Sequence, residues 1–178
     1  MPSLFTYLNT LRYLKPSQIF GRILFHVAKP RIVNRPAPPL RSLEHQLWTS
    51  PACRRTSLVG PERFSFLNKT YDLSRCGWDN PAIERLWRYH LHYFDDLNAR
   101  GSVERGKWHR DLLSRWVRDH RPNGGTGWDP YPTSLRIVNW IKWTLAGNSL
   151  PLECAESLAV QTRWLARRLE THLLGNHL

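Results

Sequence analysis

The sequence has few cysteines, no long apolar run and few acidic residues. Its three cysteines, Cys53, Cys76 and Cys154, are widely spaced and contain no Cys-x-x-Cys pair, which excludes a disulfide framework and argues against a cysteine-based zinc site. No apolar stretch approaches the roughly 18 residues that a membrane-spanning helix needs, so no membrane span is expected. The ten glycines and thirteen prolines follow no period, which excludes collagen-like and low-complexity sequence.

The N-terminus shows no recognisable export signal. A secretory signal needs a basic segment followed by an uninterrupted apolar one, whereas Asn9, Arg12 and Lys15 interrupt the apolar residues here. This favours a cytosolic location, or export by a route that the sequence does not show.

Basic and aromatic residues, in contrast, are abundant. The 178 residues include 26 Lys and Arg against 14 Asp and Glu, a net charge of +12, with nine Trp, six Tyr and six Phe. A hydrophobic content of 41% is enough for a sizeable core and excludes intrinsic disorder. The length predicts one domain, or part of one, and the charge suits a polyanionic partner.

In the N-terminal part, the spacing of apolar residues predicts short elements and a connector. Two amphipathic helices are expected over 4–14 and 17–28, separated by Pro16. Residues 29–62 contain many prolines and predict an extended connector. Residues 63–73 alternate apolar and polar side chains, which predicts a short strand or hairpin.

From residue 80 the pattern predicts four longer helices. Asn80 and Pro81 have the chemistry of an N-cap and a first helical residue, and Gly101 is a typical helix stop. The other three helices are expected over 103–120, 134–146 and 151–174. The helix over 134–146 is apolar nearly all round, which is typical of burial on more than one side. The inward residues expected for the last helix are Ala155, Leu158, Ala159, Thr162, Leu165, Leu169 and Leu173. Helices joined by short turns favour antiparallel hairpins packed in layers, and the fold class expected is all-α.

The first candidate functional segment is the polar and aromatic run over 89–96. His90 and His92 are two residues apart, so on a helix they point roughly 200° away from each other and cannot ligate one metal. Tyr89, His92, Tyr93 and Asp96 share a side opposite the Leu and Trp stripe. The alternative is that this second face simply packs against a neighbouring element.

The second candidate segment is the glycine-rich loop over 124–136. Its prolines hold neighbouring side chains such as Tyr131 in place at modest entropic cost. Arg136 lies in the first turn of the next helix, and a guanidinium beside a helix N-terminus is a good anion receptor. The glycines match neither a Walker A loop nor a dinucleotide-binding fingerprint. The alternative is a structural turn with a salt-bridged Arg136.

The third candidate is the C-terminal pair Asn176 and His177, which comes directly after the helix stop Gly175. Two hydrogen-bonding side chains at a helix end can face a cleft. Many helices, however, end in an ordinary Gly-Asn cap, and the spacing alone does not separate these two interpretations.

Together these segments resemble a known family. The runs WRYHLHYFDDLNA (87–99), GWDPYPTSLRIVNWIKW (127–143) and HLLGNHL (172–178) occur in the order found in the N-terminal helical domain of the heparinase II/III family, which includes heparin and heparan sulfate lyases and related alginate lyases. The stretch RYLKPSQIFGR (12–22) adds support. The resemblance covers about residues 4–178. It implies an incomplete (α/α) toroid over 1–178, with N-terminal helices and the proline-rich connector in 1–79 and toroid helices in 80–178.

The resemblance also implies a reaction, the β-elimination of an acidic polysaccharide linked through a uronic acid. Removing the C5 proton requires a group that neutralises the neighbouring carboxylate, together with a Tyr or His that transfers protons. Asn176 resembles the neutralising Asn of the family, and His177 resembles the neighbouring His that assists it or acts as base. The residues expected as substrate contacts are Tyr89, His90, His92, Tyr131 and Arg136. No cofactor and no metal is expected in this part of the protein.

The chain departs from the family beyond the Asn-His pair. The catalytic Tyr and the β-sandwich domain of the family lie downstream, and the chain ends at Leu178, so we expect no catalysis from it alone. Family members that degrade polysaccharides are typically periplasmic, which leaves the location open. The alternative functions are a non-catalytic acidic-glycan-binding domain in capsule or exopolysaccharide handling and, less favoured, a basic nucleic-acid-binding helical protein. Nucleic acid is not the expected partner because the arginines are scattered and no helix-turn-helix or zinc module is present.

Overall fold

The protein is described by a computed structural model that covers residues 9, 12–28, 30–39, 53–122 and 124–169. The chain divides into two units, one made of 1–31 and 166–178 and the other of 32–165. The second unit includes residue 79, after which the toroid helices are predicted to begin, and strand β2 packs against helix α4 within it.

The first unit contains one long described helix, α2 (Pro16–Val27). It confirms the helix predicted over 17–28. Pro16 occupies the first turn, where a missing backbone N–H costs nothing, and the Gln18 side chain accepts a hydrogen bond from the Lys15 backbone N–H (2.9 Å). The helix predicted over 4–14 lies largely outside the described residues.

The second unit begins with a small antiparallel sheet, which corrects the prediction of an all-α chain. Its strands are β1 (Leu58–Gly60), β2 (Arg63–Phe66) and β3 (Lys69–Asp72), in the order β1-β2-β3. Residues Leu67 and Asn68 join β2 to β3 and both have positive φ, as the tight turn of a two-residue hairpin requires. The hairpin predicted over 63–73 is therefore confirmed, whereas β1 lies inside the stretch predicted as connector.

Helical elements of different lengths come after the sheet. They are α3 (Leu73–Cys76), α4 (Arg85–Tyr93), the 3-10 helices η1 (Asp95–Asn98) and η2 (Val103–Arg105), α5 (Gly106–Asp119), the 3-10 helix η3 (Thr126–Trp128), α6 (Pro130–Leu145) and α7 (Leu152–Leu165). The longer helices, α4 to α7, overlap the four that the sequence predicts, but α4 ends at Tyr93 instead of near Gly101 and α7 ends at Leu165, before the predicted residue 174. The described part of the chain is thus mostly helical with one small sheet, while the toroid of antiparallel hairpins remains a prediction.

Helix α4 begins later than predicted. The side chain of Asn80 accepts a hydrogen bond from the N–H of Ala82 (2.9 Å), and its carbonyl accepts one from Ile83 (3.0 Å). These bonds close a separate turn, so that the helix itself starts at Arg85. It ends at Tyr93 because Phe94 adopts a left-handed conformation (φ 59°). Asn80 therefore stabilises a turn and is not the N-cap.

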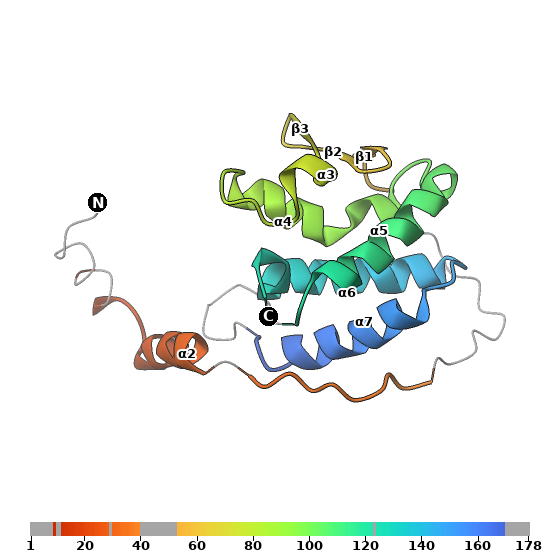
Figure 1. Ribbon diagram of the computed structural model, residues 1–178. Helices are drawn as coiled ribbons and strands as arrows, with labels where there is room; N and C mark the ends of the chain where they lie inside the picture. Colours follow the sequence, from red (N-terminus) through yellow and green to blue (C-terminus); the bar gives the residue numbers. More distant parts are fainter. Residues whose placement is uncertain (1–8, 10–11, 29, 40–52, 123, 170–178) are drawn as a thin grey trace. The chain divides into compact units, whose positions relative to one another are not determined.

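Helix α6 lies at the centre of the second unit, with α4 on one side and α7 on the other (Figure 1). The side chain of Trp140 in α6 is fully buried, as are those of Trp87 in α4 and Trp116 in α5. This confirms burial of the helix on more than one side. Val138 and Ile141 are nevertheless 45% and 43% exposed, so α6 keeps one accessible apolar strip.

Helix α7 turns inward a face that matches the predicted one in part, because Leu158 and Leu165 pack against the core as predicted. Its buried residues are Cys154, Val160, Gln161 and Trp164, while Thr162 is exposed. The polar Gln161 faces inward because it accepts a hydrogen bond from a buried arginine of α6. Of the residues that the structure describes, no helix is long and apolar enough to cross a bilayer.

Candidate functional site

Three of the predicted substrate contacts lie together where α4 meets the start of α6. The rings of Tyr93 and Tyr131 meet edge to face with centroids 5.8 Å apart, and His90 meets Tyr93 at 4.9 Å. Tyr89 precedes Tyr93 by four residues, and therefore lies on the same side of α4. Tyr131 is 49% exposed, Tyr89 and His90 are half-buried, and Tyr93 is buried beneath them. We call these four residues the aromatic surface.

Asp129 links the two helices at this surface. It lies at the N-cap position of α6 and accepts hydrogen bonds from the Tyr89 hydroxyl (2.5 Å) and from Arg85 (2.8 Å). The Arg85 guanidinium also lies over the Tyr89 ring, 5.1 Å from its centroid. Burial and the bond to Asp129 raise the pKa of Tyr89 to about 12. Tyr89 is therefore a neutral hydroxyl at physiological pH and is not a proton acceptor.

His90 and His92 lie in different environments, as their spacing predicts. His90 stacks against Phe66 at the end of the central strand β2 (5.5 Å), and burial lowers the pKa of His90 while Asp95 opposes this shift. His92 is fully buried against Trp78, and its Nδ1 accepts a hydrogen bond from the indole N–H of Trp116 (3.1 Å). Burial lowers the pKa of His92 well below its ordinary value.

Arg136 is also fully buried. It donates hydrogen bonds to the Gln161 side chain and to the Gly127 carbonyl, both at 2.8 Å. Its guanidinium lies 3.9 Å from the centroid of the Trp116 ring. In the described part of the chain no carboxylate forms an ion pair with it.

These positions correct the predictions for His92 and Arg136. A polysaccharide outside the protein does not reach either side chain, because both are enclosed by α4, α6, α7 and the loop before α6. Arg136 is neither an exposed anion receptor nor a salt-bridged turn residue. It joins three elements through neutral acceptors, and we retain no substrate contact for it or for His92.

The predicted catalytic pair, Asn176 and His177, lies outside the described residues. The role of the pair therefore stays a prediction, and the geometry of the aromatic surface is independent of it.

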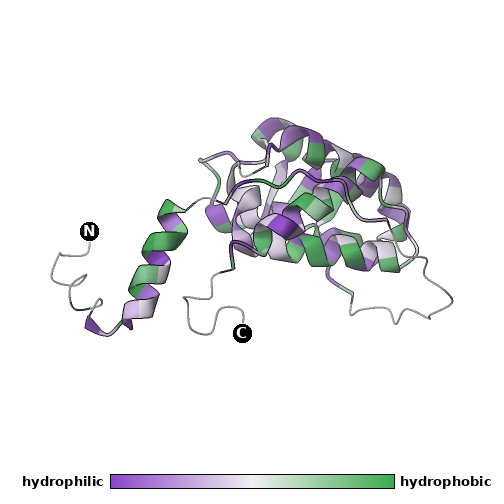
Figure 2. Ribbon diagram, turned by 90° about the horizontal axis from the view of Figure 1, so that it is seen from below, coloured by the Kyte–Doolittle hydropathy of each residue, from purple (hydrophilic) through white to green (hydrophobic). Residues whose placement is uncertain are grey.

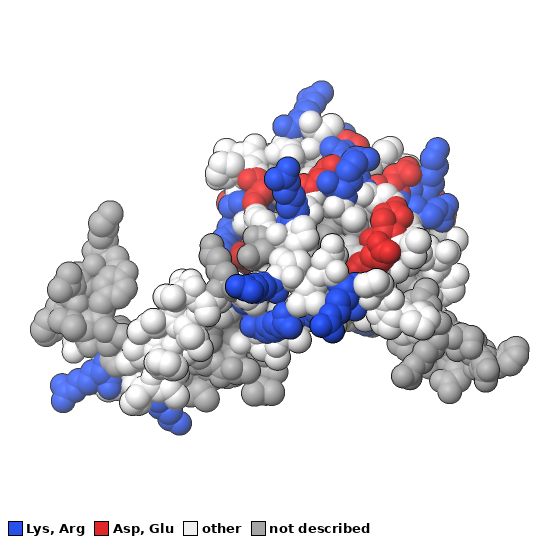
Figure 3. Space-filling view, turned by 60° about the horizontal axis from the view of Figure 1, so that its bottom comes forward, with Lys and Arg blue, Asp and Glu red and all other residues white. Residues whose placement is uncertain are grey.

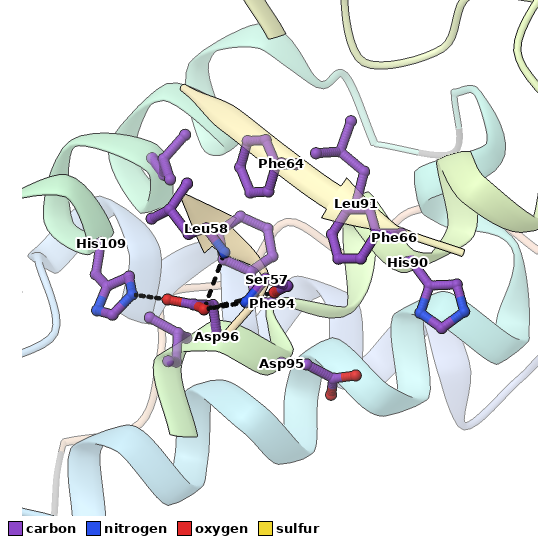
Figure 4. A pocket seen from close by; sticks show the side chains of 12 residues that line it. Ser57, Leu58, Phe64, Phe66, His90, Leu91, Phe94, Asp95, Asp96 and His109 are labelled. Atoms are coloured by element: carbon purple, nitrogen blue, oxygen red, sulfur yellow. Dashed lines mark hydrogen bonds and ion pairs between the residues drawn. The ribbon is translucent and has the colours of Figure 1, made fainter. Parts of the chain in front are cut away.

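A buried polar network with no counterpart among the predicted sites lies beside the sheet (Figure 4). Asp96 accepts hydrogen bonds from His109 and Arg105 on one oxygen, both at 2.8 Å, and from the backbone N–H groups of Ser57 and Leu58 on the other. Burial alone raises the pKa of Asp96, but these hydrogen bonds outweigh it and lower the value to about 2. The network ties η1, α5 and β1 together.

A small cavity next to this network has a volume of about 20 Å³ and is lined by residues that include Phe64, His90 and His109. This is room for about one water molecule and far too little for a sugar ring, so the network is structural. Asp96 pairs with residues 13 and 38 positions away, and no local spacing signals such pairs. Among the described residues no group of three or more His, Cys, Asp or Glu is arranged to hold a metal ion.

Comparison of the chain with protein-family models, with curated proteins and with solved structures finds no match.

Proposed function

We propose that this chain is the N-terminal helical part of a polysaccharide lyase that resembles the heparinase II/III family, and that it holds an acidic, uronic-acid-containing polysaccharide such as heparan sulfate or alginate. The observation that supports the proposal is the aromatic surface. Tyr89, His90 and Tyr131 come from two segments far apart in the sequence, and they lie within one patch of α4 and α6.

The aromatic surface suits a sugar polymer on chemical grounds. Aromatic rings with a polar atom offer an apolar face for the C–H groups of a sugar ring and a hydrogen-bonding edge for its hydroxyls. Tyr131 supplies the most exposed ring of the four. Arg85, whose side chain is 65% exposed, adds a guanidinium beside Tyr89, and guanidinium groups bind carboxylates well.

In this proposal Asn176 and His177 carry the chemistry. The Asn176 amide donates a hydrogen bond to the uronate carboxylate as the C5–H bond breaks, and His177 accepts that proton. The C4–O bond then breaks, a C4–C5 double bond forms, and the departing oxygen takes a proton from the tyrosine that the family resemblance places downstream of the Asn-His pair. The chain alone is proposed to bind the polymer without turning it over.

Calorimetric titration with heparan sulfate and alginate oligosaccharides tests the binding step, with neutral dextran as the ligand control. Tyr131→Ala is expected to weaken binding about tenfold, since a stacked ring contributes on the order of 1 kcal/mol or more. Ile141→Ala removes a similarly exposed apolar side chain from the same helix and is expected to leave binding unchanged. Equal losses in both variants, or equal binding of dextran, would contradict the proposal.

A non-catalytic acidic-glycan-binding domain is the second candidate, and the same aromatic surface favours it. An assay of the full-length protein with each polymer separates the lyase from the binding domain, because only a lyase releases an unsaturated uronate, which absorbs ultraviolet light. Binding without product favours the second candidate. Nucleic acid has less support, because Lys and Arg are interspersed with Asp and Glu on the face shown in Figure 3.

A further inference from the structure

Helix α2 has an apolar face that nothing in the described part of its own unit buries. Successive residues of a helix are rotated by about 100°, which places five apolar side chains on one side. They are Ile19, Phe20, Ile23, Leu24 and Val27. Phe20 is 68% exposed, Ile23 58%, Leu24 52% and Val27 77%. Figure 2 shows apolar and polar positions interspersed along the ribbon of α2. A contiguous exposed apolar face of this kind is typical of an interaction surface.

The opposite side of α2 is already occupied within its own unit. The Arg168 guanidinium lies 3.6 Å from the centroid of the Phe25 ring, and it donates a hydrogen bond to the Phe25 carbonyl. Arg167 donates to the carbonyl of Arg31 (3.2 Å). Phe25 is about 200° from Val27 around the helix. Among the described residues, the contacts of the unit therefore hold one side of α2 and leave its apolar face exposed.

The sequence that flanks this helix carries charge of one sign. The first 43 residues contain seven Lys and Arg and no Asp or Glu, the first acidic residue being Glu44. Arg22 is exposed on the polar side of α2, and Arg12 and Lys15 are exposed just before it. An apolar face with exposed basic residues on and just before its helix complements a surface that is apolar inside and anionic outside.

We infer that α2 binds the surface of an anionic lipid bilayer, with Phe20, Ile23, Leu24 and Val27 inserted among the acyl chains and the basic residues facing the headgroups. Interfacial helices combine a basic polar face with an aromatic and aliphatic one. Twelve residues extend about 18 Å, too little to cross a hydrocarbon core of about 30 Å, so the helix lies parallel to the membrane plane.

The charge favours lipid over a second copy of the chain. Two copies that met through α2 would bring two sets of basic residues together with no acidic residue from the first 43 to pair with them, and like charges repel. Anionic headgroups, in contrast, attract each Lys or Arg near the surface. Membrane binding is independent of the proposed glycan binding, because it uses none of the residues of the aromatic surface.

Co-sedimentation of the whole chain with vesicles tests the inference. The probe is an equimolar mixture of phosphatidylglycerol and phosphatidylcholine, with pure phosphatidylcholine as the charge control. We expect binding to the mixed vesicles that weakens with added salt. The double variant Phe20→Ser, Ile23→Ser is expected to bind at least tenfold more weakly, because two large side chains no longer enter the acyl region.

The matched control is Val138→Ser, Ile141→Ser, which changes two exposed apolar residues of α6 instead and is expected to leave vesicle binding intact. Arg22→Glu tests the charge with the apolar face unchanged, and is expected to weaken binding about fivefold or more. Equal losses in the two double variants would overturn the inference, as would the absence of vesicle binding or a concentration-dependent dimer that only the α2 variant abolishes. Unchanged glycan binding by the α2 variant shows that the two surfaces act separately.

Discussion

The guanidinium of Arg136 lies over the indole ring of Trp116, with 3.9 Å between its central carbon and the ring centroid. A buried cation is costly unless other groups compensate it. Here the compensation comes from the ring, from the Gly127 carbonyl and from the Gln161 side chain, through cation–π attraction and neutral dipoles. Because these groups belong to α5, α6, α7 and η3, Arg136 joins the elements that form the centre of the second unit.

Arg136→Lys is expected to lower the free energy of unfolding by about 3 kcal/mol, because lysine cannot donate to both acceptors and leaves buried polar groups unpaired. Denaturation by urea, followed by circular dichroism, measures the change. A variant that keeps its stability but loses glycan binding would contradict the structural role of Arg136. It would support the prediction that Arg136 binds an anion.

Gly127→Ala is expected to destabilise the protein by about 1–3 kcal/mol. A Cβ at this position would lie 2.9 Å from ring atoms of the fully buried His92, which has no room to move. Gly106→Ala is the control, since its Cβ would meet only the end of the Arg110 side chain at 3.7 Å. Thermal unfolding of both variants tests the difference, and equal melting temperatures would show that His92 is not tightly held.

The Asp96 network predicts a loss of stability in strong acid. The pKa of Asp96 is lowered to about 2, so its contribution is complete above its ordinary pKa of 3.8 and is lost as the pH falls through the lower value. That contribution is about 2 kcal/mol. Asp96→Asn is expected to flatten the stability curve in this window, whereas Asp111→Asn, on the exposed side of α5, is not. An unchanged curve for Asp96→Asn would refute the assignment.

The burial of His120 predicts a second loss of folding stability, at a milder pH. Its ring stacks on Trp116 with centroids 4.5 Å apart, and burial lowers its pKa to about 4 from an ordinary 6.5. The unfolded chain therefore binds the proton more readily, and stability that is complete above pH 6.5 is lost as the pH falls toward 4, by roughly 3 kcal/mol. His120→Gln is expected to reduce this slope in urea titrations at stepped pH. Part of the pH dependence is expected to remain in this variant, because His92 also has a lowered pKa.

Much of the secondary structure is predictable from local spacing. The positions of α2 and of the four longer helices, and the β2–β3 hairpin, follow from the period of the apolar residues. The predicted start of α4 is wrong because Asn80 forms a turn with the same side-chain chemistry as an N-cap. Strand β1 is not predictable in this way, because its pairing with β2 depends on residues beyond the proline-rich stretch.

The candidate site is predictable only in part. The sequence pattern selects Tyr89, His90 and Tyr131, and they do lie in one patch. The same patterns select His92 and Arg136, which lie in the interior. A pattern identifies which side chains share a helix face, but it does not show which element covers that face. For the same reason the Asp96 network, whose members come from β1, η1 and α5, has no local signal.

The sequence by itself determined that the chain is basic, mainly helical and rich in tryptophan, because composition is read directly and the period of apolar residues acts over a few turns of one helix. Only the tertiary structure decided which polar groups are enclosed and which remain accessible. The packing of α4, α6 and α7 enclosed Arg136 among neutral acceptors, while the absence of any described partner over its apolar side left α2 open. Burial depends on what distant segments bring to a side chain, and that information is not contained in its neighbours along the chain.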